Sequence, residues 1–136
     1  MVNSIIAAGR ECLGTPFKHQ GRTVGVGLDC AGVLVHVANR LGIPHTDVIG
    51  YGRVPAKLQL KQVLDNQQSL KRVGAEDKKA GDILLMTFVK EPQHIAIYTG
   101  DTVIHAYEQA GKCCEHRLCK LWESRILCVY RFEVCK

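Results

Sequence analysis

One cysteine stands where a thiol can become a nucleophile. Cys30 follows Asp29 at the point where a glycine-rich segment, residues 14–29, gives way to apolar residues at helical spacing. At such a helix start, backbone N–H groups and the positive end of the helix dipole stabilise a thiolate, and they can also hold an oxyanion. On position alone, a buried thiol that packs as a small hydrophobic group is an equally good interpretation. The position therefore nominates Cys30 as a nucleophile without deciding its role.

A β-hairpin is predicted in the second half of the chain. Residues 94–99 and 102–107 are short runs with strand character, and Gly100-Asp101 between them fits a two-residue loop. With that loop, Ala96 lies opposite His105. A three-residue loop would shift the register by one and reverse which side chains share a face. The predicted faces thus depend on the length of this loop.

Two histidines, His94 and His105, share one face of the hairpin in the two-residue register. They are diagonal neighbours with backbones roughly 7–8 Å apart, a gap that two imidazoles can bridge. His94 could then take the thiol proton of Cys30, while His105 binds the other ring nitrogen of His94. Without Cys30, the favoured interpretation would be two structural strand histidines with satisfied hydrogen bonds.

The elements that must position these side chains indicate an α+β fold. Helical spacing is predicted over residues 3–13, from Cys30 to Leu41, and over residues 56–67. Strands are predicted over residues 82–89, 94–99, 102–107 and 126–134. Helices come first and an antiparallel sheet second, which is an α+β arrangement. A chain of this length fits one domain, so residues 1–136 are expected to form a single catalytic domain.

Composition argues against nucleic acid binding and against a transmembrane segment. The net charge of +5 favours anionic partners, but the aromatic residues form no basic-aromatic cluster of the kind that stacks bases, so nucleic acid is not expected. No apolar run approaches the length of a membrane span. The N-terminus lacks the pattern of a signal peptide, so we expect the chain to be cytoplasmic as synthesised.

Five short motifs, in order along the chain, resemble those of the NlpC family of bacterial and phage cell-wall peptidases. They are Gly14-Thr15-Pro16-Phe17, Gly27-Leu28-Asp29-Cys30-Ala31-Gly32, Ala80-Gly81-Asp82-Ile83-Leu84, His94-Ile95-Ala96-Ile97-Tyr98-Thr99-Gly100 and Ile104-His105-Ala106. The resemblance covers most of residues 10–110 and keeps the family's unpermuted order of Cys, His, His. The string Thr15-Pro16-Phe17-Lys18-His19-Gln20 looks most like the subgroup encoded with phage tail genes.

The resemblance implies a papain-like α+β fold and a murein endopeptidase that hydrolyses amide bonds in peptidoglycan stem peptides. It implies Cys30 as nucleophile, His94 as base and His105 as the orienting residue, with no cofactor. The expected partners are a peptidoglycan peptide and phage tail proteins, with the chain associated with a virion or otherwise delivered to the cell wall. Two alternatives stay open: an amidase or acyltransferase on another small amide or lipid, and a phage-tail structural component that retains the fold.

Four further residues are expected to bind substrate: Phe17, His19, Asp29 and Ala31. Phe17 stands where many family members have tyrosine, so it can line the groove only by packing. His19 lies in the loop expected to border the cleft, and loop residues commonly carry binding. Ala31 replaces a serine of the family and keeps only the backbone N–H as a donor. Small residues at 31 and 32 are expected to leave room for substrate.

A group of thiols near the C-terminus raises the question of zinc. Cys113, Cys114, His116 and Cys119 lie close together in sequence, with Cys128 downstream. Their spacing does not match paired Cys-x-x-Cys knuckles, and residues 113–120 have the character of a strand, which would place neighbouring side chains on opposite faces. We therefore predict no metal site.

Overall fold

The structure, a computed structural model, describes residues 2–47, 59–88 and 93–133. Its elements in chain order are α1 (Val2–Arg10), β1 (Arg22–Thr23), β2 (Gly27–Leu28), α2 (Cys30–Leu41), α3 (Gln59–Asp65), β3 (Leu70–Val73), the 3₁₀ turn η1 (Ala75–Asp77), β4 (Ile83–Met86), β5 (His94–Tyr98), β6 (Thr102–Tyr107), the 3₁₀ turn η2 (Glu108–Ala110), β7 (Lys112–Arg117), α4 (Lys120–Glu123) and β8 (Ile126–Phe132). Helices α1, α2 and α3 precede the strands of the six-stranded sheet, and this segregation of helices from strands is typical of an α+β fold. Among the described residues, none of the helices has the length and apolar character needed to cross a bilayer.

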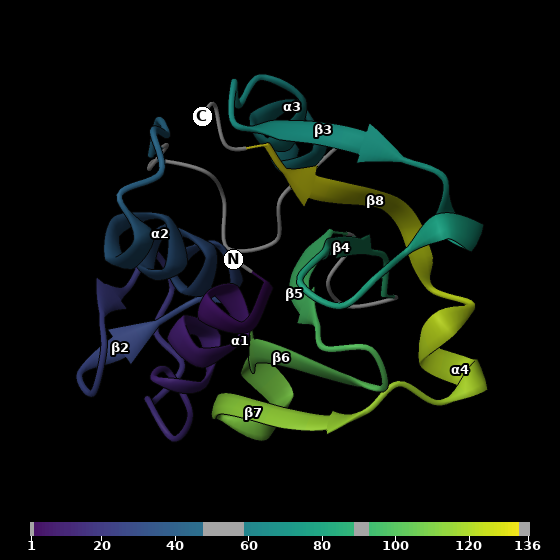
Figure 1. Ribbon diagram of the computed structural model, residues 1–136. Helices are drawn as coiled ribbons and strands as arrows, with labels where there is room; N and C mark the ends of the chain where they lie inside the picture. Colours follow the sequence, from purple (N-terminus) through teal and green to yellow (C-terminus); the bar gives the residue numbers. More distant parts are fainter. Residues whose placement is uncertain (1, 48–58, 89–92, 134–136) are drawn as a thin grey trace.

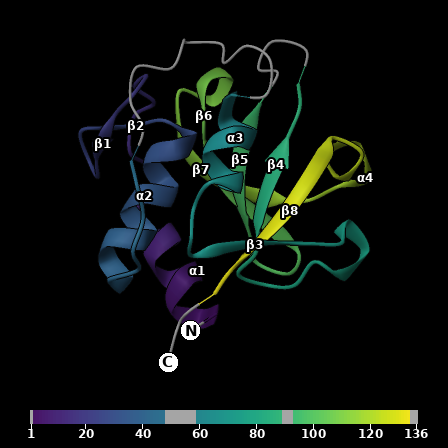
Figure 2. The same cartoon turned by 90° about the horizontal axis from the view of Figure 1, so that it is seen from above.

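Six of the strands form one antiparallel sheet. Their order is β3-β8-β4-β5-β6-β7, and β1 and β2 form a separate small hairpin. Helices α1 and α2 pack against each other and against β5, and α2 also contacts β6 (Figure 1). The view from above shows α1 and α2 on one side of the sheet and α4 on the far side (Figure 2).

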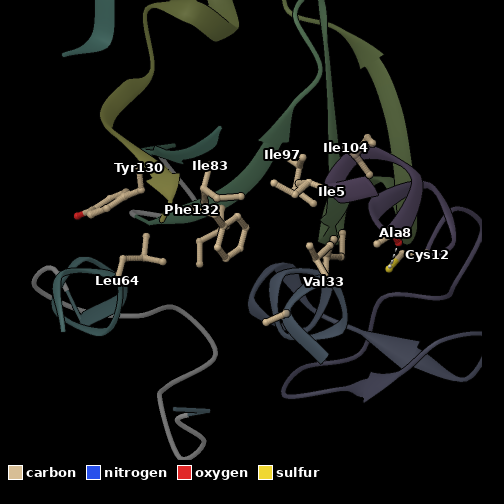
Figure 3. Packing of buried hydrophobic residues seen from close by; sticks show 14 of the residues in the cluster. Ile5, Ala8, Cys12, Val33, Leu64, Ile83, Ile97, Ile104, Tyr130 and Phe132 are labelled. Carbon is tan, nitrogen blue, oxygen red and sulfur yellow. Dashed lines mark hydrogen bonds between the residues drawn. The ribbon is translucent and has the colours of Figure 1, made fainter. Parts of the chain in front are cut away.

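Both faces of the central strands are buried. One apolar cluster joins the sheet to the helices: Ile5 of α1 and Val33 of α2 pack with Ile97 and Ile104 (Figure 3). The other cluster lies on the opposite face and includes Leu84, Met86, Ala96, Val103 and Val129, with Trp122 of α4 packed against it. Because strands covered on both faces are apolar on both, β4 is a continuous apolar run with no alternation.

The predicted helix boundaries hold best where local capping signals are strong. Helix α2 spans Cys30–Leu41 as predicted, because Gly42 adopts the left-handed conformation (φ 66°) and its N–H binds the last carbonyls. Helix α1 ends at Arg10, before the predicted Leu13, since the chain tightens into turns such as Cys12 N to Gly9 O. The predicted helix over 56–67 is α3, although residues 56–58 lie outside the described residues.

Three elements escaped the sequence prediction: the β1–β2 hairpin, β3 and α4. Strand β3 pairs with β8, yet its burial shows no alternation, so no period-two signal exists in its sequence. The predicted strand over 113–120 is mostly correct, but β7 covers Lys112–Arg117 and the chain then turns into α4. The predicted strands over 82–89 and 126–134 correspond to β4 and β8, with residues 89 and 134 outside the described residues.

Candidate active site

Asp29 fixes the start of the helix that carries Cys30. It is the N-cap of α2 in extended conformation, and its Oδ1 accepts a hydrogen bond from the Gly32 N–H at 2.8 Å. The same carboxylate binds the Arg22 guanidinium at 2.9 Å and the Gln20 N–H at 2.9 Å. Asp29 is buried. Its carboxylate therefore joins the glycine-rich loop to the helix, and the expectation that it also binds substrate stays a prediction.

The glycine-rich loop lies directly on the first turn of α2. A Cβ at Gly32 would lie 2.3 Å from the Gly21 carbonyl oxygen, and a Cβ at Gly21 would lie 2.5 Å from the Gly27 backbone. These are closer than non-bonded atoms approach, so the loop can sit here only because both positions are glycine. We expected Gly32 to leave room for substrate, but the space beside it is filled by the protein's own loop.

The remainder of that loop contacts the start of β7, the edge strand of the sheet. Phe17 forms an isolated bridge with Leu28, and its N–H donates to the Gly111 carbonyl at 2.9 Å. Pro16 forms a second bridge with Lys112 at the start of β7. The Phe17 side chain is half-buried against the main apolar cluster, and its contact with substrate stays a prediction. His19 is also half-buried in this loop, and its contact with substrate stays a prediction.

The predicted hairpin register is confirmed. The Thr99 N–H donates to the Thr102 carbonyl at 3.0 Å across the Gly100-Asp101 loop, and Ile97 pairs with Ile104. Continued by one pair, this register sets Ala96 opposite His105, as the two-residue loop requires.

The two predicted histidines meet as that register demands. His94 Nε2 and His105 Nδ1 share a hydrogen bond of 2.6 Å, and both side chains are fully buried. Burial, followed by the neighbouring His94 and His116, lowers the pKa of His105 to about 2. His105 is therefore neutral at physiological pH, so it can orient His94 but cannot hold the proton itself.

A third histidine, which the sequence reasoning assigned to the thiol cluster, belongs to this group. His116 Nε2 lies 2.8 Å from His105 Nε2. His116 pairs with Val103 across β6 and β7, while His105 pairs with Cys114, so the two histidines are diagonal neighbours as His94 and His105 are. Extending the hairpin register to the next strand would have found it. In the described part of the chain, no group of three or more His, Cys, Asp or Glu side chains could hold a metal ion.

Aromatic rings enclose the histidines. Phe88 lies 5.2 Å from His94, Tyr107 stacks on His105 at 5.2 Å, and Trp122 lies 4.5 Å from His116, all between ring centroids. Rings of this size keep water away from the imidazoles, which strengthens the hydrogen bonds between them.

Helix α2, which begins at Cys30, packs on β5, which begins at His94. Cys30 is the first residue of α2 and is half-exposed, and His94 is the first residue of β5, which α2 contacts. Cys30 packs against the apolar cluster that contains Ile95, the chain neighbour of His94. The start of β5 is held in turn by Gln93, whose Oε1 accepts from the Lys61 N–H of α3 at 3.0 Å.

An apolar pocket lies between α2, α3 and the sheet. Its lining includes Ala31, Leu34, Leu60, Ile95 and Phe132. The predicted substrate residue Ala31 therefore borders a pocket, although its contact with substrate stays a prediction.

The motif Ala80-Gly81-Asp82, which precedes β4, binds both strands that flank β4. Asp82 is buried and accepts two hydrogen bonds from the Arg131 guanidinium of β8, both at 2.9 Å. The Gly81 N–H donates to the Tyr98 carbonyl at the end of β5. Gly81 adopts φ 93°, which glycine alone adopts readily. The motif thus locks β4 to both neighbouring strands.

Comparison with known proteins assigns the chain to a family. The sequence model of the NlpC/P60 family matches residues 14–131. No curated protein matches the chain significantly. Three similar solved structures are an NlpC/P60 family protein from Bacillus cereus (21% identity, TM-score 0.70), the peptidoglycan hydrolase RipB from Mycobacterium tuberculosis (19%, 0.68) and the NlpC/P60 domain of the peptidoglycan hydrolase SagA (21%, 0.63).

The alignments with these structures cover nearly the whole chain, namely 97%, 98% and 95% of it in the same order. The chain spans 40% of the Bacillus cereus protein, 65% of RipB and 97% of the SagA domain. At these identities the structural likeness establishes a shared fold, which is the α+β arrangement predicted from the sequence.

Proposed function

The chain belongs to the NlpC/P60 family, a family of cysteine peptidases, and from this premise we propose that it hydrolyses amide bonds in peptidoglycan stem peptides. The single observation that carries the proposal is the buried hydrogen bond of 2.6 Å between His94 and His105, on a strand that packs against the helix beginning at Cys30. Two of the structural neighbours, RipB and SagA, are peptidoglycan hydrolases, which supports the choice of substrate.

The proposed reaction starts with transfer of the Cys30 thiol proton to His94. Because His94 Nε2 is bound to His105, the nitrogen that receives the proton is Nδ1. The thiolate attacks the amide carbonyl, and the N–H groups at the start of α2 hold the oxyanion. The imidazolium then gives its proton to the leaving amine, which leaves a thioester on Cys30. Water, deprotonated by His94, hydrolyses the thioester and restores the thiol.

The test is release of stem-peptide fragments from purified murein. We expect release by the wild type and by Cys119→Ala, which removes an exposed thiol, but none by Cys30→Ala. Loss of at least about a thousandfold is expected for His94→Ala because it removes the base. Equal release by Cys30→Ala and wild type would refute Cys30 as the nucleophile.

An amidase or acyltransferase on a lipid or another small amide is the second candidate, and the apolar pocket beside Ala31 favours it. Aliphatic side chains from α2 and α3 line part of the pocket, and acyl-enzyme chemistry does not fix the acceptor. A mass increase on Cys30 after incubation with an acyl lipid, and none with muropeptides, would favour this second function over the first.

Delivery to the wall by a virion or by phage tail proteins stays a proposal. Probing purified virions for the chain tests it.

A further inference from the structure

Three buried or half-buried imidazoles form a series that ends on a backbone carbonyl. His94 Nε2 contacts His105 Nδ1 at 2.6 Å, His105 Nε2 contacts His116 Nε2 at 2.8 Å, and His116 Nδ1 contacts the Arg117 carbonyl oxygen at 3.0 Å. The series crosses three neighbouring strands, β5, β6 and β7. The carbonyl is the one member whose role is fixed, because a carbonyl oxygen only accepts hydrogen bonds.

When all three rings are neutral, that fixed end sets which nitrogen of each ring carries the proton. His116 Nδ1 must carry a proton to donate to the carbonyl, so in the neutral ring His116 Nε2 accepts. His105 Nε2 must then be the donor, and its Nδ1, in a ring that burial keeps neutral, is the acceptor. His94 Nε2–H therefore donates to His105, and the lone pair of neutral His94 lies on Nδ1. This is the nitrogen that the proposed reaction needs as a base.

We propose that His116 is a positioning residue that selects the tautomer of His105 and, through it, the tautomer of His94. The consequence for catalysis rests on the proposed function, whereas the tautomers themselves do not. In the opposite tautomer, His105 Nδ1–H donates to His94 Nε2, which moves the His94 proton to Nδ1 and leaves nothing to accept the thiol proton. His116 excludes that state because its Nε2 offers a lone pair to His105.

The enclosure of the series makes this selection effective. His105 is fully buried, so water cannot take the place of His116 as the acceptor without entry to the core. Trp122 lies 4.5 Å from the His116 ring and 5.3 Å from the His105 ring, which holds both at a fixed angle. Removal of the acceptor leaves a buried donor unpaired, and that penalty falls on the productive tautomer alone.

The experiment reads the tautomers directly by long-range ¹H–¹⁵N NMR of the histidine rings at neutral pH. In the wild type we expect His94 and His105 protonated on Nε2 and His116 protonated on Nδ1. In His116→Phe we expect His105 to shift toward the Nδ1–H form. In His116→Gln, whose side-chain oxygen can accept from His105, the Nε2–H form should persist. His36→Phe, a change at a surface histidine that contacts Glu11, serves as the matched control.

A kinetic readout links the tautomers to the thiol. Alkylation of Cys30 by iodoacetamide, followed by peptide mapping, should slow by roughly 10–100-fold in His116→Phe, with recovery in His116→Gln and no change in His36→Phe, as expected when a supporting hydrogen bond is removed. The kcat for murein hydrolysis should fall in His116→Phe as the alkylation rate does, while KM stays unchanged. A purely structural role would instead lower the melting temperature and leave the His105 tautomer as it is.

Two results would overturn the inference: His105 protonated on Nδ1 in the wild type, or an unchanged His105 tautomer in His116→Phe. Because the NMR assignment on the wild type needs no variant, poor folding of His116→Phe does not remove the test. Failure of the protein to cleave murein, with the expected tautomers present, would refute the proposed substrate and leave the role of His116 intact.

Discussion

Acid should destabilise the protein in part through His105, and this effect is large enough to measure. The ring is fully buried between His94 and His116, and burial lowers its pKa from 6.5 to about 2. The unfolded chain therefore binds a proton at this residue below pH 6.5, whereas the folded chain does not. Between these two pKa values the unfolded state holds more protons, so stability must fall as the pH falls.

The size of the effect follows from the width of that window. For each pH unit that the pH falls within this window, one proton lowers the free energy of unfolding by about 1.4 kcal/mol. From about pH 7.5 to pH 4.5, the His105 contribution to the free energy of unfolding should drop by about 2.7 kcal/mol. With an ordinary urea dependence, this corresponds to a shift of about 1 to 2 M in the unfolding midpoint.

The assay compares wild type with His105→Asn, which keeps a side-chain acceptor for His94 but does not titrate. Urea unfolding is followed by circular dichroism at pH values from about 9 to 4.5. The variant starts with lower stability because the smaller side chain leaves a cavity. The informative quantity is the difference in unfolding free energy between the two proteins as a function of pH, from which other acid-sensitive groups cancel.

The two stability curves should run parallel above about pH 7.5 and converge below pH 6.5, since only the wild type loses the His105 contribution. A difference that stays constant within about 0.3 kcal/mol per pH unit across the acid range would contradict a lowered pKa for His105. His105 would then gain its proton in the folded state, and its assignment as a neutral orienting residue would be wrong.

Two substitutions and one labelling experiment test the packing that supports the site. Gly32→Ala should destabilise the protein by about 1–3 kcal/mol and abolish turnover, because the new methyl group overlaps the Gly21 carbonyl oxygen; thermal unfolding and murein release measure both. Asp82→Asn should cost about 2–4 kcal/mol in urea unfolding, because it removes the buried partner of the Arg131 guanidinium. Cys113, whose pKa burial raises to about 12, should react with iodoacetamide about a thousandfold slower than free cysteine at pH 7.5.

Each of these has a control within the chain. Gly9→Ala adds a methyl group that meets only side-chain atoms, Ile97 Cδ1 at 3.0 Å and Ile104 Cδ1 at 3.4 Å, so it should destabilise the protein less than Gly32→Ala does. Glu133→Gln breaks an exposed ion pair with Lys71 and should change stability little. Cys119 is exposed and should label readily. Equal effects of the paired glycine or carboxylate changes, or equal labelling of Cys113 and Cys119, would contradict the corresponding explanation.

Much of the fold could be predicted where the controlling interactions are local. The start and end of α2 follow from Asp29 and Gly42, which act within one helical turn. The hairpin register follows from the two-residue loop at Gly100-Asp101, since loop length alone fixes which side chains share a face. That is why the meeting of His94 and His105 could be anticipated, and the resemblance of the motifs supplied the order of their roles.

The parts that could not be predicted depend on contacts between residues distant in sequence. Strand β3 has no alternating pattern of its own and exists because β8 offers it an edge. Gly32 was expected to leave room for substrate, but a Cβ at this position would overlap the Gly21 carbonyl oxygen, so the glycine is needed for the loop to pack on the helix start.

Sequence alone predicts the helix that begins at Cys30, the histidine hairpin and the α+β class, because caps, loop lengths and periodicity are encoded over a few residues. Only the tertiary structure decided the role of His116. Its sequence neighbours are cysteines, and it joins the histidines because the η2 turn returns the chain to pair β7 with β6. That pairing places a fixed acceptor, the Arg117 carbonyl, at the end of the series, and hydrogen-bond polarity then passes through two rings to His94.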